Sequence, residues 1–348
     1  MYEHTPHRPE SAHTVACIGA GVIGGGWVAH FLARGYRVVA WDPAADAESK
    51  LRQLVDTAWP ALTELGLAAN AGRDRLRIAP TLEQAVAEAD FVQESAPERL
   101  DLKIDLLAQI DAATPAEVVI GSSTSGYSMS EMQIKAQHPE RLVVGHPFNP
   151  PYLVPLVEVV GGAASERWAV DWAAEFYRAA GKSVLTLDRE LPGFIGNRIQ
   201  EAAWREALHM VANGEATVAQ IDQAMTDGPG LRWAFFGPCL TFHLAGGTGG
   251  MAHMLDHFGP ALQAPWTRME APHLTQQLRD AMVTGTDDVV AGREVTQLIA
   301  QRDRRMIAVL RALEEVDRAE TAETAEGGHR HSALPEGATG TEESDVTP

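Results

Sequence analysis

Short apolar runs alternate with helical patterns along the first half of the chain, and this alternation constrains the fold more than any other feature. The runs predict strands over residues 15–18, 37–41, 91–93, 118–121, 142–144, 156–160 and 184–187. Amphipathic patterns predict helices between them, over residues 22–33, 48–65, 100–111 and 166–179. Strands that alternate with helices form a mostly parallel sheet with helices on both faces. The pattern therefore predicts an α/β fold with a doubly wound sheet.

The pattern changes near residues 191–193. Beyond them we predict helices over residues 195–212, 218–225, 274–282 and 293–313, and we find no convincing strand pattern. The end of the chain, residues 319–348, has seven acidic residues, one basic residue and almost no large apolar side chains. Such a segment cannot bury enough surface to offset its ordering entropy. The predicted organisation is a flexible N-terminus (1–13), a sheet domain (14–190), an all-helical C-terminal domain (191–318) and a disordered acidic tail (319–348).

Composition excludes several classes of protein. The 348 residues include 47 acidic and 28 basic side chains, a formal net charge of -19, whereas nucleic acids and anionic membranes select a basic face. Two cysteines cannot form a disulfide framework or a cysteine-based zinc site, and we predict no metal site. No apolar run approaches the roughly 20 residues of a membrane-spanning helix. We expect a soluble, cytoplasmic protein with no nucleic-acid or membrane partner.

A glycine-rich turn joins the first predicted strand to the first predicted helix. Gly19, Gly21 and Gly24 have the spacing that permits a tight turn, a close approach to a pyrophosphate and close helix–strand packing. Asp42 ends the second predicted strand, where a carboxylate accepts hydrogen bonds from ribose hydroxyls and repels a 2′-phosphate. We therefore predict NAD rather than NADP, bound at Gly19, Gly21, Val22, Ile23, Gly24 and Asp42. FAD and a glycine turn without a ligand remain alternatives.

Four further motifs follow in order along the chain. They are SSTSG at residues 122–126, GHPFNP at 145–150, LVEVV at 156–160 and PGFIGNR at 192–198. Together with the glycine-rich turn, they resemble the 3-hydroxyacyl-CoA dehydrogenase superfamily over residues 14–313. The resemblance implies a Rossmann-type cofactor domain, a helical second domain and a homodimer formed through the helical domain.

The resemblance also implies roles for particular residues. His146 matches the catalytic base, and Glu158 matches its carboxylate partner. Ser125 and Asn197 match the groups that hydrogen-bond the reacting oxygen. Two more residues, Glu98 and Lys103, match positions that contact the cofactor.

The chemistry of alcohol oxidation favours these roles independently. A hydroxyl proton must leave as hydride leaves the same carbon, and an imidazole that titrates near neutrality can take it. A buried glutamate in an apolar strand is costly unless paired, so Glu158 requires a partner. Ser125 and Asn197 can stabilise developing charge on oxygen. A structural role for His146 and a helix-terminal role for Asn197 remain open from sequence.

Departures from the family pattern indicate the substrate. SSTS replaces the usual SNTS, HPFNP replaces the usual HFFNP, and residues 228–243 most resemble the branch that oxidises L-carnitine. L-Carnitine is a 3-hydroxy acid with a quaternary ammonium group, which aromatic faces bind by cation–π contact. We predict that Trp233, Phe236 and Phe242 surround this group and that Arg232 meets the carboxylate. These aromatic residues could equally belong to a helix core.

Several other functions remain open. Close alternatives are an L-gulonate 3-dehydrogenase and a short-chain 3-hydroxyacyl-CoA dehydrogenase, although the four lysines leave little for a CoA-binding patch. A dehydrogenase of the hydroxyisobutyrate type requires a lysine where Asn197 stands. A non-enzymatic alternative is a crystallin-like protein that binds NAD without turnover.

Overall fold

A single eight-stranded sheet organises the first half of the protein. The computed structural model describes residues 8–234, 237–258 and 294–329, with isolated short stretches between 267 and 292. The strands are β1 (Thr14–Ile18), β2 (Arg37–Trp41), β3 (Leu76–Ile78), β4 (Phe91–Glu94), β5 (Val119–Ser122), β6 (Leu142–Pro147), β7 (Leu156–Gly161) and β8 (Ser183–Thr186). Their order in the sheet is β3-β2-β1-β4-β5-β6-β7-β8. The order reverses direction between β1 and β4, where doubly wound sheets bind their ligands.

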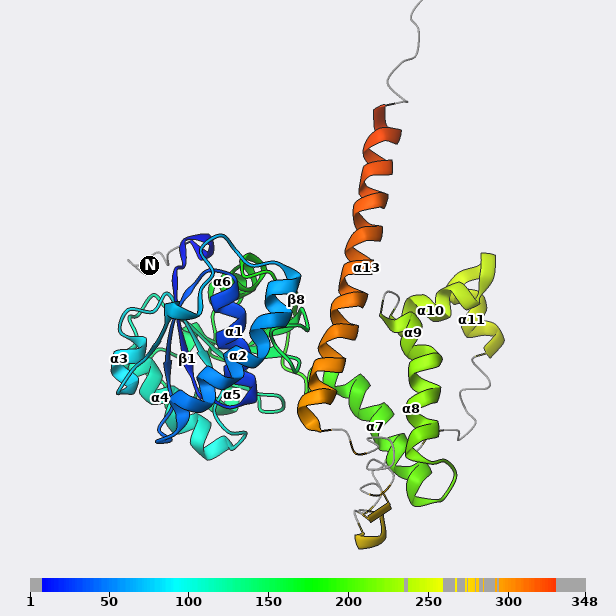
Figure 1. The fold of residues 1–348 in the computed structure, drawn as a ribbon, viewed down its shortest axis with the longest axis horizontal. Coiled ribbons are helices and arrows are strands. Elements are labelled where there is room, and N and C mark those ends of the chain that lie inside the picture. The colour runs from blue at the N-terminus through cyan, green and yellow to red at the C-terminus, as the bar shows by residue number, and fades with distance from the viewer. Residues whose placement is uncertain are drawn as a thin grey trace, which may run out of the picture.

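Helices cover both faces of this sheet (Figure 1). They are α1 (Val22–Ala33), α2 (Ala47–Leu65), α3 (Leu82–Val86), α4 (Leu100–Ala113), α5 (Met129–Met132) and α6 (Arg167–Ala179). One core cluster joins the sheet to α1, α2 and α6, and a second joins the opposite face to α3, α4 and α5. Because neighbouring strand residues point to opposite faces, Val15 and Cys17 enter the first core while Ala16 and Ile18 enter the second. The strands are therefore apolar on both sides, as the sequence pattern predicts.

The strands are parallel except at one described pair, β6 with β7. This antiparallel register places His146 directly opposite Glu158. The prediction of a mostly parallel, doubly wound sheet is confirmed. The three-residue β3 was not predicted, because its alternating Leu76-Arg77-Ile78 run is too short to stand out from a loop.

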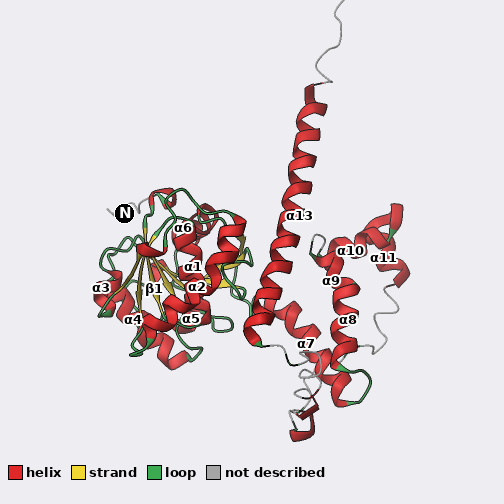
Figure 2. Cartoon of the chain, in the orientation of Figure 1, coloured by secondary structure: helices red, strands yellow, loops and turns green. Residues whose placement is uncertain are grey.

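Helices alone follow the sheet in the described residues (Figure 2). They are α7 (Gly196–Ala212), α8 (Val218–Asp227), α9 (Pro229–Trp233), α10 (Pro238–Ala245), α11 (Gly250–Phe258) and α13 (Val295–His329). Within the predicted helix over 274–282, residues 276–278, 280 and 281 are helical, and residues 274, 279 and 282 lie outside the described residues. None of these described helices is long and apolar enough to cross a membrane.

The long helix α13 returns to the sheet domain and packs against α2. Ile307 joins Ala61 and Leu153 in a small apolar cluster, and Arg311 donates a hydrogen bond to Glu64 at 2.9 Å. The helix continues past residue 313, where the predicted helix ends, to His329, and so overlaps the predicted tail that begins at residue 319. Alanine and glutamate recur in this extension, and both favour helix without any burial.

The predicted flexible N-terminus is also corrected in part. Pro9–Ser11 forms a turn of 3-10 helix, and Pro9 and Ala12 are buried. Ala12 belongs to the core cluster that contains α6, so apolar burial orders the chain before β1 begins. Residues 1–7 and 330–348 lie outside the described residues.

Candidate active site

The glycine-rich turn lies at the switch point of the sheet, between β1 and α1. Gly19 has a φ of +103°, and a Cβ there would stand 2.6 Å from the carbonyl oxygen of Ser95, beyond β4. A Cβ on Gly24 would strike the carbonyl oxygen of Gly19, whereas one on Gly21 would meet open space. That open space lies at the N-terminus of α1, where free N–H groups attract phosphate. Val22, the first helical residue, is exposed and Ile23 is half-buried beside it.

Asp42 follows β2 and faces the same turn. Its Oδ2 accepts a hydrogen bond from the Ala20 N–H at 2.9 Å, and its Oδ1 accepts one from the Ala44 N–H at 2.9 Å. These bonds fix the carboxylate beside the turn. The arrangement fits a dinucleotide with its pyrophosphate at α1 and its ribose at Asp42.

His146 and Glu158 form a buried pair on adjacent strands. His146 Nδ1 lies 2.9 Å from Glu158 Oε2, and both side chains are less than 5% exposed. The other carboxylate oxygen, Oε1, accepts backbone N–H bonds from Ile195 and Gly196, each at 3.0 Å. Burial raises the pKa of Glu158, but the hydrogen bonds from His146, Gly196 and Ile195 outweigh it and leave the pKa below its ordinary value. The ionised carboxylate only accepts, so the proton of the neutral imidazole lies on Nδ1 and Nε2 can take another.

Two aromatic rings confine the imidazole. Phe148 lies 5.0 Å and Phe194 5.1 Å from the His146 ring, measured between centroids. Phe148 also fills the space that a Cβ on Gly196 would occupy. The imidazole is therefore oriented by its carboxylate and by packing on two sides. Neither phenylalanine was predicted as a site residue, because nothing in a single sequence distinguishes an apolar loop residue that packs on a catalytic group from any other apolar loop residue.

Ser125 and Asn197 meet across the junction between sheet and helices. The Asn197 amide donates from Nδ2 to the Ser125 carbonyl oxygen at 2.8 Å. Ser125 follows β5, and Asn197 lies in the first turn of α7, next to the N–H groups that bind Glu158. The structure thus brings all four predicted catalytic residues to one end of the sheet, linked as two hydrogen-bonded pairs.

Glu98 holds the loop that carries Ser125. Its Oε1 accepts hydrogen bonds from Thr124 Oγ1 at 2.7 Å, from the Ser125 N–H at 2.9 Å and from the Gly126 N–H at 3.2 Å. Burial raises the pKa of Glu98, and the bonds from Thr124 and Ser125 with the charge of Lys103 bring it below its ordinary value. Glu98 therefore stays ionised as the loop's anchor.

Lys103 lies beneath this loop rather than at its surface. Its side chain is 1% exposed, and Nζ donates to Glu94 Oε1 at 2.9 Å and to the Ala96 carbonyl at 3.2 Å. It also lies 3.5 Å from Glu98 Oε2. Glu94, itself fully buried, accepts a short hydrogen bond from Ser122 Oγ. The role of Glu94 was not predicted, although a glutamate at the end of an apolar strand was a usable signal.

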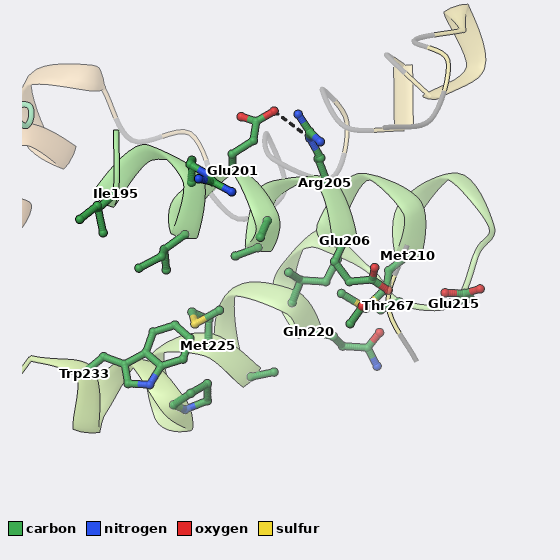
Figure 3. A pocket seen from close by; sticks show the side chains of 18 of the residues that line it. Ile195, Glu201, Arg205, Glu206, Met210, Glu215, Gln220, Met225, Trp233 and Thr267 are labelled. Carbon is green, nitrogen blue, oxygen red and sulfur yellow. Dashed lines mark hydrogen bonds and ion pairs between the residues drawn. The ribbon is translucent and has the colours of Figure 1, made fainter. Parts of the chain in front are cut away.

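A groove of about 1360 Å³ runs from the imidazole side of the site along α7 and α8 (Figure 3). Phe194, which packs on the His146 ring, lines this groove. Ile195 and Trp233 lie on opposite walls at one end of it, and Glu215 and Gln220 lie at the other end. Arg198, Glu201, Arg205 and Glu206 add charge to its wall. Of the predicted cage residues, Trp233 thus shares a groove with the neighbours of His146. Arg232 and Phe242 are exposed on α9 and α10, and Phe236 lies outside the described residues.

Family models match this chain in two consecutive parts. Residues 14–190 match the NAD-binding domain of 3-hydroxyacyl-CoA dehydrogenase, and residues 193–287 match the C-terminal domain of the same family. The chain belongs to the 3-hydroxyacyl-CoA dehydrogenase family. It is an NAD-dependent oxidoreductase, so the predictions of family, cofactor and enzyme class are confirmed.

Curated relatives within this family are similar over most of their length. The chain is 78% identical to an L-carnitine dehydrogenase of Nocardiopsis dassonvillei over 93% of this chain and 99% of that one. It is 68% identical to an L-carnitine dehydrogenase of Streptomyces coelicolor, over 87% and 96% of the two chains. It is 53% identical to that of Pseudomonas putida, over 86% and 94%.

Two solved structures have a similar fold. A 5-formyl-3-hydroxy-2-methylpyridine 4-carboxylic acid 5-dehydrogenase, an NAD+-dependent dismutase, superposes with a TM-score of 0.73 at 27% identity, covering 87% of this chain and 99% of that one. The 3-hydroxybutyryl-CoA dehydrogenase of Escherichia coli superposes with a TM-score of 0.56 at 29% identity, covering 73% of this chain and 54% of that one. The predicted fold class, a Rossmann-type sheet followed by helices, is confirmed.

Proposed function

We propose that this 3-hydroxyacyl-CoA dehydrogenase family member oxidises the 3-hydroxyl of L-carnitine to 3-dehydrocarnitine. The observation that carries the chemistry is the buried His146–Glu158 pair beside the hydrogen-bonded Ser125 and Asn197. The observation that favours carnitine is the group of relatives named L-carnitine dehydrogenase at 53–78% identity.

His146 acts as the general base in this proposal. Its Nδ1 proton is committed to Glu158, so Nε2 accepts the proton of the substrate hydroxyl. The Glu158 carboxylate then stabilises the imidazolium, which would be costly in so buried a position without a counter-charge. Positioned bases of this kind contribute about 10²–10⁴-fold to rate.

Ser125 and Asn197 orient the reacting oxygen. The second hydrogen of the Asn197 amide is a donor at the junction between sheet and helices. The Ser125 hydroxyl, which donates to Glu98 Oε1 at 3.3 Å, becomes a second donor when it turns towards the substrate oxygen. NAD, when bound at the Gly19–Gly24 turn and Asp42, supplies the hydride acceptor. The open space at Gly21 and the exposed N-terminus of α1 support its pyrophosphate, and Glu98 and Lys103 hold the Ser125 loop beside it.

The groove along α7 and α8 supports a substrate with a cationic end. Trp233 offers an aromatic face in the groove, and each desolvated cation–π contact contributes about 0.5–2 kcal/mol. Glu206 adds negative charge to the same wall, where Glu201 is paired with Arg205 at 3.0 Å. The trimethylammonium group of carnitine is on carbon 4, next to the reacting carbon 3, so the proposal requires the cation to bind close to the hydroxyl that His146 deprotonates. Arg232, Phe236 and Phe242 remain proposed substrate contacts.

The test is a substrate panel with NAD. Purified protein is mixed with L-carnitine, D-carnitine, L-gulonate and 3-hydroxybutyryl-CoA, and NADH is followed by absorbance. The proposal predicts turnover with L-carnitine and little with the others. Activity with L-gulonate or the CoA thioester but not with L-carnitine would overturn it, and NADH binding without turnover of any substrate would favour a binding protein.

We further propose that residues 14–190 bind the cofactor, that residues 191–318 complete the substrate site and that two copies associate through the helices. Exposed apolar side chains support the association, since large exposed apolar patches mark interfaces. They include Ile199, Trp204, Leu231, Leu240, Phe242 and Leu244. Sedimentation equilibrium tests this directly, and a monomer at micromolar concentration would contradict it. We place the enzyme in the cytoplasm, where the exposed thiol of Cys239 stays reduced.

A further inference from the structure

A buried lysine outside the proposed catalytic groups contacts the loop that follows His146. This loop, residues 148–154, is called here the His146 loop. Lys182 lies between α6 and β8, is 6% exposed, and donates from Nζ to the carbonyl oxygens of Pro151 and, at 3.1 Å, Val154. Most buried ammonium groups pair with a carboxylate. Here the Lys182 amine is instead bonded to two carbonyls of one loop.

The same amine also contacts the cofactor helix. Nζ lies 5.0 Å from the ring centroid of Trp27 on α1, over its face. Pro151 packs against α1 as well, because a Cβ on Gly26 would come within 2.6 Å of the proline ring. Lys182 therefore joins two elements that the reaction must keep in register: the helix whose N-terminus holds the cofactor and the loop that leaves the catalytic histidine.

The His146 loop carries one of the two aromatic rings that confine the imidazole. Phe148, the first residue of the loop, packs on the His146 ring at 5.0 Å and against Gly196 on the other side. Only two residues separate Pro151 from Phe148, so we expect a shift of Pro151 to move Phe148. Displacing a catalytic group by about 1 Å can cost about 100-fold in rate.

We propose that Lys182 is a positioning residue for hydride transfer: it fixes the His146 loop against α1 and so sets the distance between His146 and the bound cofactor. The inference rests on the proposed role of His146 and adds a residue to it. Lys182 need not be charged for this role. Burial, with the nearby charge of Arg34, lowers its pKa to about 7, and a neutral amine keeps two N–H donors for its two carbonyls. The other basic group that faces it, His30 on α1, is bonded to the Ala180 carbonyl at 2.8 Å.

The test is Lys182→Met, which keeps the length of the side chain and removes its donors. Lys135→Met is the matched control, because Lys135 is an exposed lysine that pairs with Asp105 on the surface. Three quantities are measured: the affinity for NADH by fluorescence titration, and the rate constant and the amplitude of NADH formation in a single turnover, with the amplitude expressed per mole of total protein. A loss of folded protein lowers the amplitude of the single turnover, whereas a misplaced base lowers its rate constant.

We expect the rate constant of Lys182→Met to fall by about 10- to 100-fold while the affinity for NADH and the amplitude per mole of protein stay near the wild-type values. Lys135→Met should match the wild type in all three. Gly26→Ala provides a second variant should Lys182→Met fail to fold, since its methyl group pushes Pro151 from the α1 side. In Gly26→Ala, too, the rate constant should fall while the affinity for NADH stays near the wild-type value.

A folded Lys182→Met or Gly26→Ala protein with a wild-type rate constant would overturn the inference. So would a loss confined to the amplitude, which would assign Lys182 to stability alone. A wild type that does not oxidise L-carnitine is a failure of the proposed function instead. The variants are then compared on the panel substrate that the wild type does oxidise.

Discussion

Replacing Glu158 with glutamine tests the proposed chemistry with very little change in shape. The carboxylate has two distinct oxygens: Oε1 accepts two backbone N–H bonds at 3.0 Å, and Oε2 faces His146 Nδ1 at 2.9 Å. In Glu158→Gln the single carbonyl oxygen takes the place of Oε1, since an amide NH2 there would face two donors. The NH2 then points at His146 Nδ1, which must become an acceptor. The imidazole proton moves to Nε2, the atom that has to accept the substrate proton.

A wrong tautomer of this kind lowers kcat by about 10³–10⁴-fold, equivalent to about 4–5.5 kcal/mol of lost transition-state stabilisation. The assay is NADH formation from L-carnitine, with NADH titration and circular dichroism to show that the variant is folded and binds cofactor. Glu88→Gln is the control, because Glu88 is an exposed glutamate paired with Arg37 on the surface. A loss of less than about tenfold in folded Glu158→Gln protein would refute the tautomer argument.

Three further predictions concern the cofactor, the core and acid stability. Asp42→Asn should reduce the preference for NAD over NADP by about tenfold or more, measured as a ratio of kcat/KM values, because the repulsion of a 2′-phosphate is lost; an unchanged ratio would contradict the assignment of Asp42. Asp111→Ala should lower the free energy of unfolding in urea by about 3–5 kcal/mol, since it leaves the fully buried Arg141 guanidinium without its ion pair. A loss below about 1 kcal/mol would contradict this, because it would show that the surrounding carbonyl groups stabilise the guanidinium without Asp111. The pKa of Glu158 is lowered in the folded protein, so its stabilisation is present above the unfolded pKa of about 4.3 and is lost as pH falls below it. Urea unfolding at a series of pH values should therefore be less acid-sensitive in Glu158→Gln than in the wild type, and equal slopes would count against the lowered pKa.

Much of the sheet was predictable because its signals are local. Buried parallel strands are continuous apolar runs, and the glycine-rich turn identifies the strand that precedes it and the helix that follows it. The helical half was harder to predict, because helix periodicity indicates where helices form but not which helices pack against each other. The extension of α13 through residues 319–329 was missed because a burial argument ignores intrinsic helix propensity.

The candidate site was likewise predictable from the sequence only in part. His146, Glu158, Ser125 and Asn197 were predictable from ordered motifs, and the antiparallel β6–β7 register explains the separation between the first two along the chain. Glu94, Phe148 and Lys182 were not predicted, because their roles depend on contacts between elements distant in sequence. Where Arg232 and Phe242 lie relative to substrate depends on how helices pack, which one sequence does not encode in its local patterns.

The central claim is that hydride leaves carbon 3 of L-carnitine for NAD at the His146 site, and isotope transfer tests it most directly. L-Carnitine deuterated at carbon 3 is incubated with NAD and the enzyme, and the reduced cofactor is examined by NMR. The account predicts one deuterium at carbon 4 of the nicotinamide ring and unlabelled 3-dehydrocarnitine, with transfer nearly abolished in His146→Ala protein that still binds NADH. Reduced cofactor without deuterium, or wild-type transfer rates in His146→Ala, would contradict it.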